Sequence, residues 1–277
     1  MKPLKTWPRQ AIQRITGVFT DIDDTLTTDG AITPDALAAL GALKAAGLTV
    51  IAITGRPVGW SEPFARSWPV DAIVAENGAV MLRIMNEEGS CGSQSMGRLL
   101  SKSYRQDAAT RRTNFARMQQ VTQRVLREVP TARLAQDSAG RETDMAIDHS
   151  EFTTLPPEHI ARVVAIMHSE GMHATVSSIH INGWFGTHNK LEGARWAVRT
   201  LLGRDLDAER DAWVFVGDST NDQLMFEVFS NSVGVANVRR FQAQLVHQPR
   251  YITDKERGAG FAEVAQAVLA ARPVRTP

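Results

Sequence analysis

Short apolar runs alternate with helical patterns in the first part of the chain. The runs Ile15–Thr20, Leu48–Ile53 and Ala72–Ala75 have the length and composition of buried strands. Between the first two runs, Thr33-Pro34 predicts the start of a helix, and leucines then recur at helical spacing until Gly47. The pattern therefore indicates strand, helix and strand in succession.

The same alternation returns in the last third of the chain. The pattern there predicts a helix from Lys190, a strand at Trp213–Val216, a helix at Asp222–Phe229, a strand at Val233–Val235 and a helix at Phe261–Ala271. Strands that alternate with helices are typical of a parallel sheet with helices on both faces. We therefore predict an α/β fold with a Rossmann-like parallel sheet.

The middle of the chain has a different pattern. Leu82 to Gly97 is expected to be irregular, and an arginine-rich helix is expected from Ser103 to Glu128. Arg141–Asp148 predicts a strand, Pro157–Ser169 a helix, and Met172–Ile181 two short strands. This mixture of helices and short strands is typical of an α+β domain.

These patterns predict one α/β core that is interrupted by an inserted domain. The chain has 277 residues, enough for two domains at about 150 residues each. We expect the core to comprise residues 1–83 and 187–277, and the inserted α+β cap domain to comprise residues 84–186.

Composition excludes several classes of protein. The 31 Lys and Arg residues nearly balance the 30 Asp and Glu residues, for a formal net charge of +1, which gives no support to a nucleic-acid binder. Cys91 is the single cysteine, so neither an intrachain disulfide nor a cysteine-rich metal site can form. Apolar runs are shorter than the roughly 18 residues that span a bilayer. We expect a cytoplasmic protein that does not associate with membranes.

Polar clusters occur where the predicted strands end or the helices begin. They are Asp21 and Asp23, Thr54, Lys190, and Asp218 with Asp222. Because ligands of parallel sheets bind at the carboxyl ends of the strands, we expect these clusters to converge. Carboxylate oxygens are ligands that Mg²⁺ prefers, and a Lys and a Thr can bind phosphoryl oxygens. An aspartate can also attack phosphorus to give an aspartyl phosphate.

These four polar clusters lie in segments that resemble the motifs of one protein family. In chain order they are Asp21-Ile22-Asp23-Asp24-Thr25-Leu26, Thr54-Gly55-Arg56-Pro57, Lys190 and Gly217-Asp218-Ser219-Thr220-Asn221-Asp222. They resemble the four motifs of the haloacid dehalogenase (HAD) superfamily, and the insertion between the second and third resembles the large α/β cap of its type IIB branch. Members of that branch are mostly Mg²⁺-dependent phosphatases of sugar phosphates and related metabolites.

The resemblance implies a role for each motif residue. It implies that Asp21 is the nucleophile and that Asp23 is the general acid and base. The implied Mg²⁺ ligands are Asp21, the backbone carbonyl of Asp23, Asp218 and Asp222. The implied phosphate-binding residues are Thr54, Gly55, Lys190 and Asn221.

Two further groups of residues complete the prediction. Asp24 stands where many members of the family have glycine, and we expect its side chain to point away from the metal and cap the local turn. Residues that could contact the substrate are Arg56 in the second motif and, in the cap, Arg141, His180 and Asn182.

The sequence therefore predicts an Mg²⁺-dependent phosphatase that acts on a small phosphomonoester, such as a sugar phosphate or a phosphorylated sugar acid. A phosphohexomutase-type phosphotransferase of the same fold is the first alternative, and it would need a sugar bisphosphate primer. A non-catalytic, receiver-like phosphoacceptor module is the second. Receivers are much shorter and have no cap, so the length of this chain disfavours that alternative.

Overall fold

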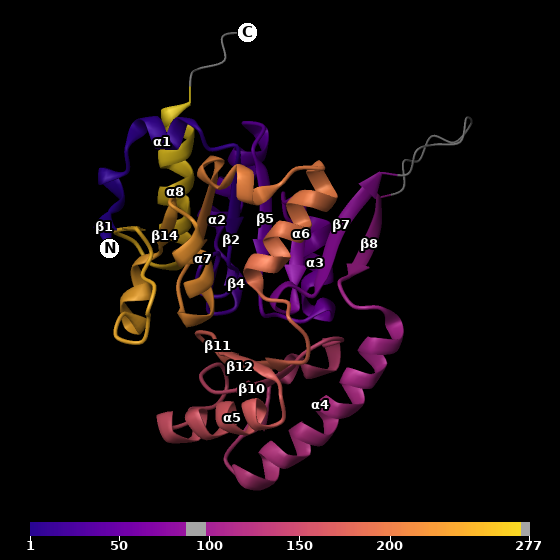
Figure 1. The fold of residues 1–277 in the computed structure, drawn as a ribbon. Coiled ribbons are helices and arrows are strands. Elements are labelled where there is room, and N and C mark those ends of the chain that lie inside the picture. The colour runs from indigo at the N-terminus through magenta and orange to yellow at the C-terminus, as the bar shows by residue number, and fades with distance from the viewer. Residues whose placement is uncertain (87–97, 273–277) are drawn as a thin grey trace, which may run out of the picture.

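The computed structural model describes residues 1–86 and 98–272, which form two lobes (Figure 1). The larger lobe is built on a nine-stranded sheet with helices on both faces. The smaller lobe, below it in Figure 1, contains a four-stranded sheet with two helices. The α/β fold class with an inserted α+β cap is confirmed.

The large sheet is parallel except at one edge. Its strands in spatial order are β1 (Lys2–Pro3), β15 (Tyr251–Ile252), β14 (Ser232–Gly234), β13 (Trp213–Gly217), β2 (Gly17–Thr20), β5 (Thr49–Ile53), β6 (Ala72–Ala75), β7 (Val80–Asn86) and β8 (Arg98–Tyr104). Neighbouring strands from β1 to β6 pair in parallel, whereas β6, β7 and β8 pair antiparallel. The central strands β13, β2 and β5 therefore all end at the same edge of the sheet.

Successive residues of the central strands face opposite sides of the sheet, and this forms two hydrophobic cores. Val18 and Val50 belong to the first core, with residues of α1 (Arg9–Gln13), α2 (Pro34–Ala45), α3 (Val58–Ser67) and α8 (Arg257–Ala271). The adjacent residues Phe19 and Ile51 belong to the second core, with residues of α6 (Lys190–Leu202) and α7 (Gln223–Val228). Burial on both faces explains why these strands are continuous apolar runs.

Local sequence fixes the start of α6. The side chain of Asn189 accepts a hydrogen bond from the backbone N–H of Glu192, so α6 begins at Lys190. Gly78 lies against the backbone of Asn189 with a φ of +103°, and a Cβ atom at Gly78 would collide with the Asn189 carbonyl. This close approach positions the first turn of α6 beside the ends of the strands.

The smaller lobe has its own sheet and its own core. Its strands lie in the order β11 (His173–Val176), β12 (His180–Trp184), β10 (Met145–Asp148) and β9 (Arg133–Leu134), all antiparallel. The helices α4 (Ala108–Glu128) and α5 (Pro157–Ser169) pack against this sheet through a third hydrophobic core. They lie on the side away from the larger lobe, so the cap sheet faces the large lobe (Figure 1).

Short elements complete the fold. A separate two-stranded ribbon consists of β3 (Thr27–Thr28) and β4 (Ala31–Ile32). The 3-10 helices are η1 (Leu4–Thr6), η2 (Glu76–Gly78), η3 (Gln136–Gly140), η4 (Leu206–Ala208), η5 (Arg210–Ala212), η6 (Thr220–Asp222) and η7 (Ala236–Phe241).

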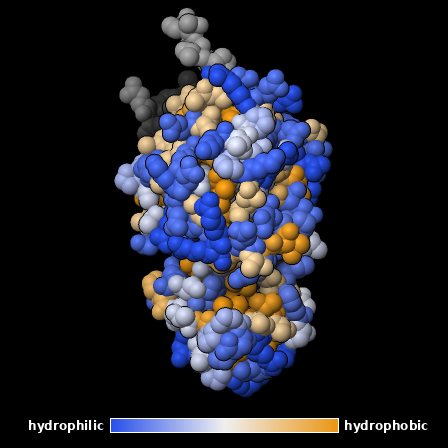
Figure 2. All heavy atoms as spheres, turned by 90° about the vertical axis from the view of Figure 1, so that its left-hand side faces the viewer, coloured by the Kyte–Doolittle hydropathy of each residue, from blue (hydrophilic) through white to orange (hydrophobic). Residues whose placement is uncertain are grey.

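The hydropathy of the surface differs between the larger lobe and the junction of the two lobes. Figure 2 shows hydrophilic side chains over most of the larger lobe, a narrowing between the lobes, and hydrophobic side chains exposed near that narrowing. Within residues 1–86 and 98–272, no helix has both the length and the apolar character needed to cross a bilayer.

Two expectations for the middle of the chain were wrong. Residues 82–86 belong to β7 rather than to an irregular segment, and the arginine-rich helix begins at Ala108 instead of Ser103 because β8 continues to Tyr104.

The domain boundaries at 83/84 and 186/187 remain a proposal. Strand pairing favours moving the first of them beyond Tyr104, because β8 still pairs with β7 in the large sheet. The rest of the segment that was expected to be irregular, residues 87–97 with Cys91, lies outside the described residues.

Candidate active site

The predicted motif residues meet at the carboxyl edge of the large sheet. Asp21 follows β2, Thr54 follows β5, and Asp218 follows β13. These three strands are neighbours and parallel, so their ends lie side by side. Lys190 reaches the same edge from the first turn of α6.

Lys190 is the centre of the polar cluster. Its Nζ lies 2.9 Å from Oδ1 of Asp21 and 2.7 Å from Oδ1 of Asp222. The second carboxylate oxygen of Asp222 accepts hydrogen bonds from the backbone N–H groups of Asp218 (2.9 Å) and Ser219 (3.2 Å). Asp222 therefore fixes both the lysine and the loop that carries Asp218.

Three buried carboxylates form a possible metal site. Asp21, Asp218 and Asp222 each offer an oxygen within 4.8 Å of the others. Burial raises the pKa of Asp21 to about 7, although the charge of Lys190 lowers it. Burial, together with the charges of Asp21 and Asp222, raises the pKa of Asp218 well above its usual value. One lysine does not neutralise three carboxylates, so this all-oxygen cluster fits a hard divalent cation such as Mg²⁺.

The side chain of Asp23 points to a different partner. Its carboxylate oxygens lie 2.9 and 3.1 Å from Nε of Arg56. Burial raises the pKa of Asp23, and the charge of Arg56 opposes that effect. The Asp23 carboxyl also lines a cavity of about 480 Å³ between the lobes. Other residues around this cavity are Thr27, Arg56, Glu151, Phe152 and Arg257.

The remaining core candidates lie beside this cluster. The hydroxyl oxygen of Thr54 accepts a hydrogen bond from the Arg56 N–H at 2.9 Å, so its own hydrogen can be donated to another group. The carbonyl of Gly55 faces the cap, where it accepts hydrogen bonds from side chains. Asn221 lies in the fourth motif, and its side-chain oxygen accepts a hydrogen bond from Ser219 Oγ at 3.0 Å.

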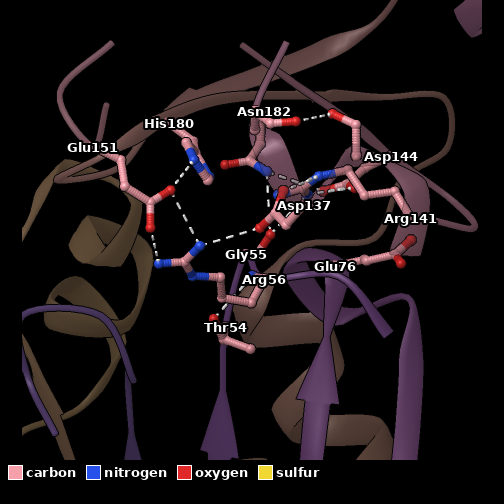
Figure 3. Close-up of polar contacts among 12 residues, drawn as sticks. Thr54, Gly55, Arg56, Glu76, Asp137, Arg141, Asp144, Glu151, His180 and Asn182 are labelled. Carbon is pink, nitrogen blue, oxygen red and sulfur yellow. Dashed lines mark hydrogen bonds and ion pairs between the residues drawn. The ribbon is translucent and has the colours of Figure 1, made fainter. Parts of the chain in front are cut away.

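The three cap candidates lie at the boundary between the lobes and have protein partners (Figure 3). Arg141 donates to the carbonyl of Gly55 (3.0 Å) and to Asp144 (2.7 Å). Asn182 donates to the same two groups, at 3.2 and 3.1 Å. Nε2 of His180 lies 2.8 Å from Oε2 of Glu151. Contact of these residues with a substrate remains a prediction. In this structure Arg141 and Asn182 join the cap to the second motif, whereas His180 binds Glu151 within the cap.

Asp24 forms an ion pair instead of capping its own turn. Its Oδ1 lies 3.0 Å from Nε of Arg257 in α8. Among the described residues the carboxylate cluster is Asp21, Asp218 and Asp222, so Asp24 is directed away from it, as expected. The φ of Asp24 is +53°, in the left-handed region that glycine adopts most readily. This conformation explains why a glycine fits at the same position of the motif.

The conformation of Asp24 predicts different costs for two small replacements. Asp24→Ala is expected to lower the free energy of unfolding by about 1–2 kcal/mol, because alanine loses the ion pair and tolerates a positive φ poorly. Asp24→Gly loses the same pair but relieves the backbone, so we expect a cost below about 1 kcal/mol. Denaturant unfolding of both variants measures the difference. Equal losses would mean that the backbone conformation does not matter here.

A buried acidic residue that the sequence analysis did not identify binds the cap. Glu76 follows β6, and its carboxylate accepts hydrogen bonds from the backbone N–H groups of Val58 (3.0 Å), Glu142 (2.9 Å) and Thr143 (2.5 Å). Burial raises its pKa. The next residue, Asn77, donates to Asp144 of the cap at 3.3 Å. The position of Glu76 and Asn77 after a buried strand was the one available signal.

A sequence comparison supports the resemblance seen in the motifs. The sequence model of the haloacid dehalogenase-like hydrolases matches residues 18–94, which include the first two motifs. No curated protein matches the chain.

Solved structures share the fold of most of the chain at low sequence identity. A protein of Thermoplasma acidophilum is 16% identical, with a TM-score of 0.66, and the match covers 92% of this chain and 98% of that one. The sucrose-phosphatase of Synechocystis, solved with sucrose and phosphate, is 14% identical, with a TM-score of 0.61 and coverage of 92% and 98%. A HAD subclass IIB sugar phosphatase is also 14% identical, with a TM-score of 0.58 and coverage of 91% and 96%.

The core, the inserted cap and the four motifs together define a capped α/β protein with a buried cluster of carboxylates at the carboxyl edge of its sheet. The chain has the fold of the haloacid dehalogenase superfamily, and a HAD subclass IIB sugar phosphatase is among the structures that share this fold over most of their length. The resemblance predicted from the motifs is therefore confirmed.

Proposed function

We propose that this protein is an Mg²⁺-dependent phosphatase that hydrolyses a small phosphomonoester through a phosphorylated Asp21. The observation that carries the proposal is the cluster of Asp21, Asp218 and Asp222 at the carboxyl edge of the sheet, in which Lys190 binds Asp21 and Asp222. Such a cluster brings together a nucleophile, ligands for a cation and a fixed positive charge, which are the parts that phosphoryl transfer requires.

In the first step, a carboxylate oxygen of Asp21 attacks the phosphorus atom. The bond between phosphorus and the leaving oxygen breaks, and Asp23 donates its proton to that oxygen. The Lys190 ammonium and the Thr54 hydroxyl bind the phosphoryl oxygens as charge moves onto them. The raised pKa of Asp23 favours the protonated form that this step needs.

In the second step, Asp23 takes a proton from a water molecule. The resulting hydroxide attacks phosphorus, the bond to Asp21 breaks, and inorganic phosphate leaves with the Asp21 carboxylate restored. The cap covers the site in the present structure, because Asn182 and Arg141 bind the carbonyl of Gly55. A closed cap limits the access of water during the first step.

The donor set of the site suits Mg²⁺. Asp21 and Asp218, with Asp222 beside them, would hold the ion together with the backbone carbonyl of Asp23. Bound there, Mg²⁺ supplies positive charge for the phosphoryl oxygens and relieves the repulsion among the buried carboxylates.

We propose a sugar phosphate, or a phosphorylated sugar acid, as the substrate. The cavity of about 480 Å³ beside Asp23 has the size of a small-molecule site. Its wall combines carboxylates and arginines with Phe152, a mixture that can bind hydroxyl groups and cover one face of a sugar ring. Two of the similar structures belong to sugar phosphatases.

Phosphate release from a panel of sugar and small-acid phosphates tests the proposal. We expect release from one or two members of the panel with Mg²⁺ and none with a chelator. Transfer that requires an added sugar bisphosphate, with little phosphate released, would favour the phosphohexomutase alternative instead. A stable phosphoprotein without turnover would favour the phosphoacceptor module.

A further inference from the structure

Arg56 connects the predicted general acid, Asp23, to the cap. Figure 3 shows Arg56 with its cap partner Glu151. On the core side, its Nε lies 2.9 Å from Asp23, and one terminal nitrogen lies at the same distance from that carboxylate. On the cap side, its terminal nitrogens lie 2.7 Å from Glu151 and 3.2 Å from Asp137. One guanidinium therefore holds one carboxylate of the core and two of the cap.

Glu151 is fixed in place by its own loop and by β12. The carboxylate of Asp148 accepts hydrogen bonds from the backbone N–H groups of Ser150 (3.1 Å), Glu151 (2.9 Å) and Phe152 (2.9 Å). His180 binds the other oxygen of Glu151 at 2.8 Å. Although burial raises it, the hydrogen bonds from His180 and Arg56 lower the pKa of Glu151 to about 2, so this carboxylate carries its charge.

Asp137 is fixed by a second arginine. Its Oδ1 lies 3.0 Å from a terminal nitrogen of Arg141, which also binds Asp144 and the Gly55 carbonyl. The side chain of Arg141 is 2% exposed, so this arrangement is built into the interior of the boundary between the lobes. The cap thus presents two preorganised carboxylates to Arg56.

The core alone leaves the end of the Arg56 side chain without these partners. Within the core, its backbone N–H donates to Thr54 and its guanidinium lies 4.9 Å from the ring of Trp60. The side chain is 5% exposed, so its terminal N–H groups depend on protein partners for their hydrogen bonds. If the cap moved away, Arg56 would lose Glu151 and Asp137 and would be free to reorient, together with the carboxyl group of Asp23.

We propose that Arg56 is a positioning residue that makes the placement of the Asp23 carboxyl depend on the closed cap. The inference rests on the proposed function, in which Asp23 protonates the leaving oxygen. Cap closure then assembles the general acid as well as covering the site, so that the proton is delivered only when the substrate is enclosed.

Two esters of nearly equal shape measure this effect. The leaving group of 4-nitrophenyl phosphate is a stable anion that needs little protonation, whereas that of phenyl phosphate is more basic and depends on the general acid. The value of kcat/KM reports the steps up to departure of the leaving group. The ratio of the two kcat/KM values therefore reports how well Asp23 is placed, and a general loss of stability or binding does not change it.

Two variants change different contacts of Arg56: Arg56→Lys weakens its contacts with both Asp23 and the cap, whereas Glu151→Gln weakens a contact with the cap alone. In Arg56→Lys, a single ammonium cannot hold Asp23 and the cap at once. We therefore expect the kcat/KM for 4-nitrophenyl phosphate divided by that for phenyl phosphate to rise by about tenfold. In Glu151→Gln, we expect a rise of about threefold, because Arg56 keeps Asp137 but loses the charge of Glu151. The control is Arg124→Lys, since Arg124 also joins two carboxylates, Glu128 and Glu170, but on the outer surface of the cap. In Arg124→Lys the ratio of the two kcat/KM values should stay unchanged.

Two results would overturn the inference. If Arg56→Lys and Glu151→Gln slow both esters by the same factor, the arginine has only a structural role. If Glu151→Gln leaves the ratio unchanged while Arg56→Lys raises it, Arg56 positions Asp23 without the cap. Should Arg56→Lys fail to fold, Asp137→Asn and Glu151→Gln decide by the same ratio. A wild-type protein that hydrolyses neither ester nor any sugar phosphate would instead remove the proposed function, and the inference with it.

Discussion

Asp21→Asn is expected to lower phosphate release by about 10³-fold or more while the fold is kept. An amide of the same shape still accepts the hydrogen bond that Lys190 donates to Oδ1 at 2.9 Å, so the cluster retains its packing. The amide cannot form an aspartyl phosphate, so the first step has no nucleophile. Phosphate release from the best substrate of the panel, measured with Mg²⁺ for the variant and the wild type, tests this expectation.

The same variant is also expected to be more stable than the wild type when a chelator is present. Burial raises the pKa of Asp21 to about 7, so folding favours the protonated form, and at pH 8 the wild type holds an ionised carboxylate at a cost. Asparagine removes that charge, and we expect a gain of about 1–3 kcal/mol in the free energy of unfolding. Added Mg²⁺ should stabilise the wild type more than the variant.

A control and a contrary result complete this test. Asp254→Asn changes an exposed aspartate and should alter neither activity nor stability. Phosphate release by Asp21→Asn at a rate near that of the wild type would exclude Asp21 as the nucleophile. A variant that is inactive and less stable in chelator would show that the carboxylate of Asp21 supports the fold rather than straining it.

The core of the site could be predicted from the sequence because its signals are local. Each central strand is a continuous apolar run, since both faces of the sheet are buried, and its end is marked by polar residues. Asp21, Thr54 and Asp218 therefore stood out as polar residues directly after such runs. The parallel arrangement then required that they lie together.

The contacts between the lobes could not be predicted in this way. In the cap, the backbone N–H groups of Glu142 and Thr143 bind the carboxylate of Glu76, and no local pattern marks a residue for such a partner. The pair of Arg56 and Glu151 likewise joins residues from two lobes. A periodic pattern describes which residues face a core, but not which buried charges meet across a boundary.

One expectation failed for a related reason. Residues 82–86 read as an irregular segment because glycines and serines follow them, yet they form the end of β7. The partner strand β8 supplies the hydrogen bonds that hold this edge, from Val80 paired with Tyr104 to Asn86 paired with Arg98. Pairing with the next strand along the chain outweighs weak local propensity.

Lys190→Met is expected to destabilise the protein in chelator by about 3–5 kcal/mol, because it leaves buried carboxylates without their cation. Lys190 is 2% exposed at its side chain and binds both Asp21 and Asp222. Although burial lowers it, the charges of these two residues raise the pKa of Lys190, which indicates that the folded protein holds the charged form. Methionine fills a similar volume, so the loss measures charge rather than packing.

The control for this variant is Lys44→Met. Lys44 also binds a carboxylate, Asp71, at 2.6 Å, but both side chains are 32% exposed, so we expect a loss of about 1 kcal/mol or less. Denaturant unfolding in chelator and in Mg²⁺ measures both variants.

Because Mg²⁺ supplies the missing positive charge, it should recover part of the stability that Lys190→Met loses, and none of the stability that Lys44→Met loses. Turnover should still fall by about 10²–10³-fold, since the ion does not replace the ammonium that, in the proposed mechanism, binds the phosphoryl oxygens. Equal stability of Lys190→Met and the wild type in chelator would mean that the carboxylates are protonated in the folded protein, and that Lys190 serves the substrate alone.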